Sequence, residues 1–283
     1  RDVGKPLHEA HWDVDAAISH LAYHAGMPTK VQGETIPVPG ERLDFTRREP
    51  YGVSVHITPW NYPLTLALRD VAPALACGNA VVIKPPRIAP LSTLAFGRLA
   101  VEAGLPPGTI NVVPGSGSDL GPRLIGHDRT GVVTFTGSVE TGRRVAEAAS
   151  RELVPVNLEL GGKSPNVVFP DADLSSAVRN AIAGIFVNAG QMCVAGSRLL
   201  VHEAVHDEVV DRLVDAVEAM TVGPGQDEDT DMGPLASADH RDSVLEYIER
   251  GEAEGATLVA GGGPPEGRDA GYFVAPTVFD DVD

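Results

Sequence analysis

Apolar and polar positions between Tyr51 and Phe169 alternate between two patterns along the chain. Short apolar runs are typical of buried strands, and they occur at Val53–Ile57, Ala80–Ile83, Ile110–Val113 and Val132–Phe135. Longer runs of helical character separate them, at Leu64–Cys77, Leu91–Ala103 and Thr141–Ala149. A glycine follows each of the first two, as is common at helix ends. Strands that alternate with helices in this order predict a mostly parallel sheet with helices on both faces.

A second series of elements follows the glycine pair Gly161–Gly162, where we place a domain boundary. Strands are predicted at Asn166–Phe169, Leu199–His202, Thr257–Ala260 and Tyr272–Ala275, and helices at Leu174–Asn188, Val205–Ala219 and Ala238–Glu252. We therefore predict a first domain built from residues 1–30 and 51–161, and a second domain over residues 162–283.

Residues 31–50 interrupt this rhythm with two extended runs, Glu34–Val38 and Leu43–Arg48, around a Pro-Gly pair. This pattern predicts a β-hairpin. Its polar, proline-bearing sequence makes a poor core strand, so we expect a protruding arm that needs a partner to be stable.

The charge and composition of the chain argue against several classes of partner. The chain carries 22 Lys and Arg against 39 Asp and Glu, a formal net charge of −17. This balance argues against nucleic-acid and anionic-membrane partners, because phosphate binding needs clustered cations. No apolar run approaches the ~20 residues of a membrane span, and no secretory signal opens the chain. Two cysteines in 283 residues indicate a reducing compartment, so we expect a cytoplasmic protein without a disulfide framework. We also expect no metal site.

Cys193 stands out from the other cysteine by its sequence context. A lone cysteine is most often a small buried hydrophobe, but Cys193 lies in the polar, glycine-bearing stretch Gly190-Gln191-Met192-Cys193, after a predicted helix. Cys77 is the contrast, because it closes an apolar helix, and we interpret it as structural.

Two further polar side chains follow predicted strands. Glu159 ends an apolar strand, where apolar surroundings would disfavour its charged form and suit a general base; the alternative is a strand-end charge that faces solvent. Asn61 stands between Pro59 and Pro63, which makes its amide a pre-organised donor for an oxyanion, or else part of a turn without function.

The ends of three other strands carry features that suit a nucleotide. Lys84 follows a strand and is placed for a ribose hydroxyl or a phosphate. The turn at Gly115–Gly117, which leads to Gly121, and the turn at 135–138, which leads to Gly142, join strands to helices. Backbone N–H groups at such junctions can meet a pyrophosphate, although glycine also occurs there for steric reasons.

Taken together, these segments resemble the NAD(P)-dependent aldehyde dehydrogenase superfamily. The matching motifs are PWNYP at 59–63, IKPP at 83–86, FTGS at 135–138, LELGGKSP at 158–165 and GQMC at 190–193. They occur in the family's order and spacing over essentially the whole chain. The resemblance implies a Rossmann-like NAD(P)-binding domain, a second α/β catalytic domain and an oligomerisation hairpin at 31–50. It also implies a small-molecule aldehyde substrate, NAD or NADP as cofactor, and a homodimer or homotetramer.

The resemblance also implies residue roles. Cys193 corresponds to the nucleophile, Glu159 to the general base and Asn61 to the oxyanion donor. The corresponding cofactor contacts are Thr58, Pro59, Trp60, Lys84, Arg87, Gly117, Gly121, Phe135, Thr136, Gly137, Ser138, Gly142 and Leu160.

Departures from the family pattern leave alternatives open. Arg87 stands where the family usually has a glutamate that repels a 2′-phosphate, which favours use of NADP as well as NAD. Both ends of the family's chain are missing, so we interpret the sequence as part of a longer enzyme. The alternatives are a semialdehyde dehydrogenase that acylates coenzyme A, which usually lacks the glutamate at Glu159, and a truncated member without catalysis.

Overall fold

The structure, a computed structural model, describes residues 2–268 and 270–282. Arg1 and Asp283, the ends of the predicted domain ranges, therefore lie outside the described residues. The chain divides into two compact units. One unit, called here the sheet unit, consists of Trp12–Leu160. The other, called the cysteine unit, consists of the residues before Trp12 and the residues after Leu160. The sequence predicts that the segment before Trp12 belongs to the first domain, whereas in the structure it belongs to the cysteine unit.

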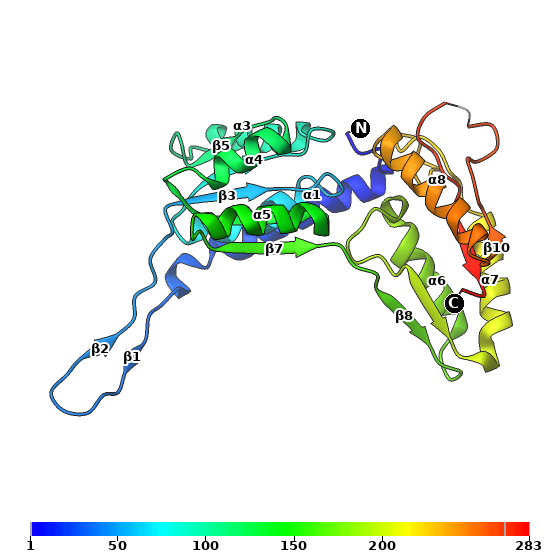
Figure 1. The fold of residues 1–283 in the computed structure, drawn as a ribbon, viewed down its shortest axis with the longest axis horizontal. Helices are drawn as coiled ribbons and strands as arrows, with labels where there is room; N and C mark the ends of the chain where they lie inside the picture. Colours follow the sequence, from blue (N-terminus) through cyan, green and yellow to red (C-terminus); the bar gives the residue numbers. More distant parts are fainter. Residues whose placement is uncertain (1, 269, 283) are drawn as a thin grey trace. The chain divides into compact units, whose positions relative to one another are not determined.

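Five parallel strands build the sheet unit (Figure 1). They are β3 (Val53–Ile57), β4 (Ala80–Lys84), β5 (Ile110–Val112), β6 (Thr130–Gly137) and β7 (Val156–Leu160), in the order β5-β4-β3-β6-β7. The chain starts in the middle, adds strands on one side and then crosses to the other. This order confirms the predicted Rossmann-like core, and it puts the topological switch point, where such sheets bind ligands, between β3 and β6.

Helices cover both faces of the sheet, as predicted. On one face Val55 and Phe135 pack with side chains of α4 (Gly117–Ile125) and α5 (Val139–Arg151). On the other face Val81 and Ile83 pack with Leu68 and Val71 of α2 (Thr65–Ala76). Helix α3 (Leu91–Glu102) contacts the edge strand β5.

Helix α1 (Leu7–Ala25) was not predicted from the sequence. Its residue Ala17 is buried against the α2 face of the sheet, but Trp12, Ile18 and Tyr23 are exposed. Apolar residues on several sides of a helix blur the periodic pattern that identifies a helix in a sequence.

A two-stranded hairpin leaves the sheet unit between α1 and β3 (Figure 1). It follows a short 3₁₀ turn (Pro28–Lys30), and β1 (Thr35–Ile36) pairs antiparallel with β2 (Asp44–Phe45). Every strand residue of the hairpin is exposed. The ladder is shorter than the predicted runs, and the Thr46 N–H donates to the Glu34 carbonyl at 2.8 Å beyond it.

The cysteine unit pairs β8 (Pro165–Val168) with β9 (Arg198–Val201) in parallel, and β10 (Thr257–Ala260) with β11 (Val278–Asp280) in antiparallel fashion. Its helices are α6 (Leu174–Phe186), α7 (His206–Glu218) and α8 (Ala238–Ala253), with short 3₁₀ segments at Val187–Gly190 and Glu203–Val205. Its main core joins α6 and α7 through Val178, Phe186, Val209 and Leu213.

The strand predicted at Tyr272–Ala275 is wrong. The backbone there bonds to loops instead of a ladder, because the Leu235 N–H donates to the Tyr272 carbonyl and the Ala275 N–H donates to the Gly263 carbonyl.

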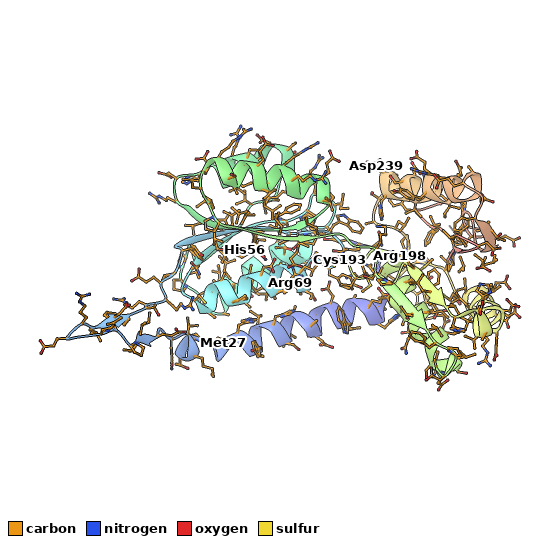
Figure 2. The ribbon with its side chains drawn as sticks, turned by 60° about the horizontal axis from the view of Figure 1, so that its bottom comes forward. Met27, His56, Arg69, Cys193, Arg198 and Asp239 are labelled. Carbon is orange, nitrogen blue, oxygen red and sulfur yellow. The ribbon has the colours of Figure 1, made fainter. Side chains whose placement is uncertain are left out.

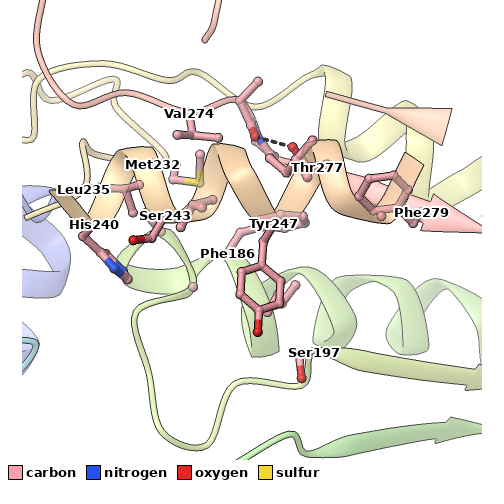
Figure 3. Close-up of a pocket in the computed structure, with 18 of the residues that line it drawn as sticks. Phe186, Ser197, Met232, Leu235, His240, Ser243, Tyr247, Val274, Thr277 and Phe279 are labelled. Atoms are coloured by element: carbon pink, nitrogen blue, oxygen red, sulfur yellow. Dashed lines mark hydrogen bonds between the residues drawn. The ribbon is translucent and has the colours of Figure 1, made fainter. Parts of the chain in front are cut away.

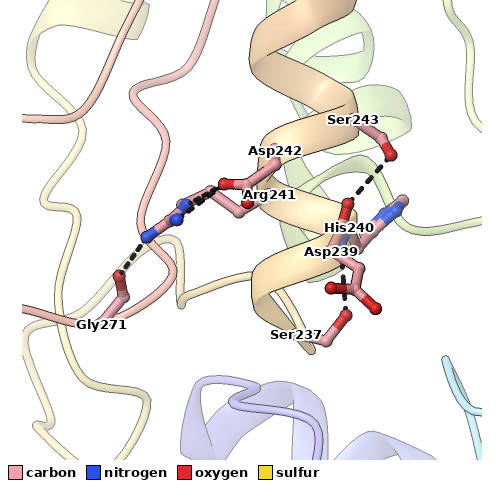
Figure 4. A network of polar contacts seen from close by, with 7 residues as sticks. All are labelled: Ser237, Asp239, His240, Arg241, Asp242, Ser243 and Gly271. Atoms are coloured by element: carbon pink, nitrogen blue, oxygen red, sulfur yellow. Dashed lines mark hydrogen bonds and ion pairs between the residues drawn. The ribbon is translucent and has the colours of Figure 1, made fainter.

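Nearby, Arg241 of α8 donates to the Gly271 carbonyl at 3.3 Å and pairs with Asp242 (Figure 4). Ser237 caps α8, since its hydroxyl accepts the His240 N–H at 3.2 Å. No helix in the described part of the chain is long and apolar enough to cross a membrane.

Candidate functional site

The carboxyl end of β3 begins the candidate cofactor site. Ile57 is in register with Phe135 on β6 and with Lys84 on β4, so Thr58, Pro59, Trp60 and Asn61 emerge at the switch point. The Thr58 N–H donates to the Lys84 carbonyl at 3.2 Å. The Thr58 hydroxyl is buried and has no hydrogen-bond partner among the described residues. A buried hydroxyl of this kind calls for a polar partner, which a bound ligand can supply.

Asn61 is half-buried in the turn that leads into α2. Its side-chain oxygen accepts the N–H of Tyr62 at 3.1 Å. This bond orients the amide group, because it commits the oxygen to the backbone. The predicted role of Asn61 as an oxyanion donor therefore uses the NH₂ end of the same group.

Lys84 ends β4 as a buried residue beside the start of α4. Its Nζ lies 3.6 Å from the place that a Cβ on Gly117, the first residue of α4, would take. Burial is the main reason that the pKa of Lys84 lies below its usual value, and the nearby charge of Arg87 adds to the effect. Arg87 itself is exposed. A cation such as Lys84 beside a helix N-terminus forms an environment that favours an anion.

The glycines of the second turn have different reasons to be there. A Cβ on Gly142 of α5 would stand 2.5 Å from the Leu160 side chain, so this glycine lets α5 pack against β7. A Cβ on Gly137 would stand 2.5 Å from the Phe135 ring. Ser138 caps α5, since its hydroxyl accepts the Thr141 N–H. Gly121 is buried on α4, but a Cβ there would meet nothing within 4 Å. Packing thus explains Gly137 and Gly142 without a ligand.

Glu159 lies on the edge strand β7, in register with Thr136. Its side chain is 51% exposed, so the apolar surroundings expected from the sequence are absent. Its neighbour is Arg69 of α2, whose Nη1 lies 3.9 Å from Oε2 of Glu159. Arg69 also donates to Thr136 Oγ1 and to Asp70 Oδ1, at 3.0 Å each, and Figure 2 labels it on α2.

Sequence reasoning did not identify Arg69 and Asp70. Burial raises the pKa of Asp70 above its usual value; the charge and hydrogen bond of Arg69 oppose this effect, and the Glu159 charge adds to it. The available signal was two adjacent charges inside the otherwise apolar run Leu64–Cys77. A charged pair there indicates a polar partner on the sheet.

Cys193 belongs to the cysteine unit and lies half-buried in the loop between α6 and β9 (Figure 2). The Met192 N–H donates to the Gly190 carbonyl at 2.8 Å, and the Gly196 N–H donates to the Gly184 carbonyl of α6 at 2.9 Å. A Cβ on Gly162 would stand 3.2 Å from the Cys193 carbonyl oxygen. Cys77, the other free thiol, is exposed at the C-terminal end of α2.

An apolar pocket of about 570 Å³ also lies in the cysteine unit (Figure 3). Phe186, Leu235, Tyr247, Val274 and Phe279 line it, and Cys193 is not among its lining residues. Within the sheet unit, Thr58–Asn61, Lys84 and Glu159 all stand at or beside the carboxyl ends of the strands.

Comparison with known proteins identifies the family of the chain. The model of the aldehyde dehydrogenase family matches residues 1–283. A hydroxyisobutyraldehyde dehydrogenase of Mycolicibacterium austroafricanum is 51% identical over 99% of this chain and 56% of its own length. Mouse retinal dehydrogenase 2 is 47% identical over 99% of this chain and 54% of its own length. The chain thus spans a little over half the length of these curated relatives.

Solved structures show the same fold. An aldehyde dehydrogenase of Bacillus cereus, solved as an NAD+ complex, has a TM-score of 0.97 and 44% identity, over 100% of this chain and 57% of its own. The crystal structure of PnpE from Pseudomonas sp. WBC-3 has a TM-score of 0.96 and 42% identity, over 98% of this chain and 58% of its own. With a family match along its whole length and this fold, the chain belongs to the aldehyde dehydrogenase family.

Proposed function

We propose that the protein oxidises an aldehyde to a carboxylic acid with NAD+ or NADP+, through a thioester on Cys193. The observation that carries the proposal is the doubly wound sheet whose switch point bears Asn61 and Lys84, in a chain that the aldehyde dehydrogenase family matches from end to end. Relatives named for dehydrogenation of aldehydes, and a structural relative solved with NAD+, support the reaction class and the cofactor.

The residues at the switch point fit a dinucleotide. The Thr58 hydroxyl, which has no hydrogen-bond partner among the described residues, offers a hydrogen bond, and Lys84 supplies positive charge beside Gly117 at the start of α4. The oxidised nicotinamide supplies a hydride acceptor when it is bound. The glutamate that would repel a 2′-phosphate is replaced by Arg87. Use of both cofactors is therefore our proposal.

The chemistry follows from what an aldehyde lacks. It has no leaving group, so the Cys193 thiolate first adds to the carbonyl carbon and forms a tetrahedral thiohemiacetal. The Asn61 amide donates a hydrogen bond to the resulting oxyanion. When the C=O bond re-forms, the C–H bond breaks and its electron pair leaves with the hydride. Glu159 then takes a proton from water, which attacks the thioester and releases the acid and the Cys193 thiol.

A burst experiment on the full-length protein tests this assignment. We expect Glu159→Gln to slow thioester hydrolysis more than hydride transfer, because the amide cannot accept a proton from water. Mixing enzyme, aldehyde and cofactor should then give a rapid burst of reduced cofactor, close to one equivalent per active site, followed by a slow steady state.

Two cysteine variants serve as controls for the burst. Cys193→Ala should abolish turnover, whereas Cys77→Ala, which removes an exposed thiol at the end of α2, should keep most of it. Near-normal turnover in Cys193→Ala would contradict the mechanism. Equal loss of burst and steady-state rates in Glu159→Gln, with no acyl-enzyme, would remove Glu159 from its role. Faster turnover with coenzyme A, together with an acyl-coenzyme A product, would favour the acylating alternative.

A further inference from the structure

The turn between α6 and Cys193 has an unusual backbone. Asn188, Ala189 and Gly190 are left-handed in succession, with φ of 52°, 53° and 74°. Glycine adopts this conformation freely, but for Asn and especially Ala it is strained. Strained residues persist only where their surroundings hold them, and they tend to cluster at functional sites. The turn ends three residues before Cys193.

A buried carboxylate holds this turn from far away in the sequence. Both oxygens of Glu9, near the start of α1, lie 2.9 Å from the backbone nitrogen of Asn188. Glu9 is 5% exposed and Asn188 is 2% exposed. A hydrogen bond to an ionised carboxylate is stronger than one between neutral groups, and exclusion of water increases its effect.

Gln191 completes the network from the other side of the turn. Its side-chain NH₂ donates to the Asn188 carbonyl at 2.8 Å, and its side-chain oxygen accepts the Ala236 N–H at 3.0 Å. The Asn188 amide in turn donates to the Gln191 carbonyl. Hydrogen bonds therefore hold the backbone on both sides of Ala189, and Glu9 contributes a carboxyl group to them.

Burial works against the ionised form of Glu9. Burial raises the pKa of Glu9, which means that the fold disfavours its ionised form. The Asn188 N–H, followed by the nearby charges of His8 and Lys5, counteracts this effect. Both oxygens of this buried carboxyl group therefore bind one strained backbone position, which they help to hold in place.

We propose that Glu9 is a positioning residue for Cys193, which holds the left-handed turn at Asn188–Gly190 and thereby fixes the backbone that presents the thiol. The bond from Gly196 to Gly184 fixes the loop downstream of Cys193, and Glu9 fixes it upstream. The inference rests on the proposed function only in that Cys193 is the group to be presented.

The test uses Glu9→Gln in the full-length protein with Cys77→Ser, so that Cys193 is the reactive thiol within this region. The amide keeps the size of the side chain but loses its charge, and one of its two polar ends becomes a donor. We expect amide hydrogen exchange at Asn188 to become about tenfold faster or more. We also expect a several-fold change in the rate at which iodoacetamide alkylates Cys193, and a fall in kcat with little change in KM.

A matched control is Glu254→Gln, which removes an exposed carboxylate paired with Arg250 on α8. This variant should leave all three measurements at their wild-type values. Exchange in α7 should stay unchanged in both variants, because a general loss of stability would accelerate it there too.

The outcomes separate this inference from the proposed function. Unchanged Asn188 exchange and Cys193 alkylation in Glu9→Gln would overturn it, and so would a Glu9→Gln chain that fails to fold, since Glu9 would then be structural. Exchange and alkylation need no aldehyde. A protein that oxidises no aldehyde but shows both changes would contradict the proposed function and keep the positioning role.

Discussion

Lys84 and Arg87 show how much the role of a side chain depends on its immediate surroundings. Lys84 ends β4 and Arg87 follows three residues later, but Lys84 is buried and Arg87 is exposed. Burial lowers the pKa of Lys84, and the nearby Arg87 charge adds to that effect. An anion with two negative charges, such as a 2′-phosphate, would relieve the repulsion between these two charges.

We expect Arg87→Glu to shift cofactor preference toward NAD. A planar guanidinium can make two parallel bonds to phosphate oxygens, and a charge-assisted bond contributes about 1.5–3 kcal/mol. This corresponds to a change on the order of tenfold to a hundredfold in the ratio of kcat/KM for the two cofactors, mainly through KM for NADP. Arg98→Glu, on the exposed surface of α3, is the matched control. An identical ratio in Arg87→Glu and wild type would exclude Arg87 from cofactor choice.

Arg69 gives the exposed Glu159 side chain a charged partner. Without it, Glu159 is a half-exposed carboxylate on an edge strand. With it, three elements meet, because one guanidinium contacts Glu159 on β7, Thr136 on β6 and Asp70 on its own helix. One guanidinium thus ties Glu159 on β7 to β6 and α2.

At the scale of elements, the hairpin is the part of the sheet unit with the least internal support. Its strands are two residues each, and Leu43 and Phe45 are 77% and 56% exposed. Isolated two-stranded hairpins are marginally stable in water. Exposed apolar side chains on such an arm favour contact with another surface, and we propose that this surface belongs to a second copy of the protein.

Deletion of residues 31–50 should therefore reduce the mass of the assembly in analytical ultracentrifugation. Leu43→Ser with Phe45→Ser is the gentler variant, because it leaves the backbone in place and removes only the two exposed apolar side chains. We expect this double variant to dissociate at a higher protein concentration than wild type. An assembly of unchanged mass in both variants, or a wild-type monomer, would contradict an interface role.

For the molecule as a whole, a buried histidine of the sheet contributes to the dependence of stability on pH. His56 on β3 is 2% exposed, and neither ring nitrogen has a hydrogen-bond partner among the described residues (Figure 2). Burial lowers the pKa of His56 from 6.5 to about 4. Between pH 6.5 and about pH 4, His56 binds a proton in the unfolded chain but not in the folded chain. The contribution of His56 to the free energy of unfolding therefore falls as pH falls through this window.

We expect His56→Phe to lose less stability than wild type between pH 7 and pH 4.5. The full effect of His56 amounts to roughly 3 kcal/mol, from about 1.4 kcal/mol per pKa unit. Urea unfolding at several pH values measures it. Glu9 and Asp70 have raised pKa values, so their effect has the opposite sign and is present in both proteins.

The exposed His127 gives the control for this comparison, since it pairs with Asp128 at the surface. His127→Gln should follow the wild-type dependence on pH. If His56→Phe also follows it, then His56 takes no part in acid unfolding.

The sequence by itself determined the elements with a strong local pattern and the residues at their ends. β3 begins and ends at the predicted residues, and α2, α3 and α5 lie within two residues of the predicted bounds. This was possible because apolar periodicity is a local property, and because a parallel sheet brings the ends of its strands to one edge. Asn61 and Lys84 could be placed at that edge for the same reason.

Only the tertiary structure decided which distant groups meet. Glu9 reaches Asn188 across 179 positions, and Arg69 reaches Thr136 across 67. Strand β11, rather than Tyr272–Ala275, completes the ladder with β10. Local periodicity carries no information about such pairs, because each is set by how whole helices and strands pack. A strained turn likewise leaves no pattern in the sequence, since Glu9, which bonds to Asn188, and Ala236, which bonds to Gln191, lie far from the turn along the chain.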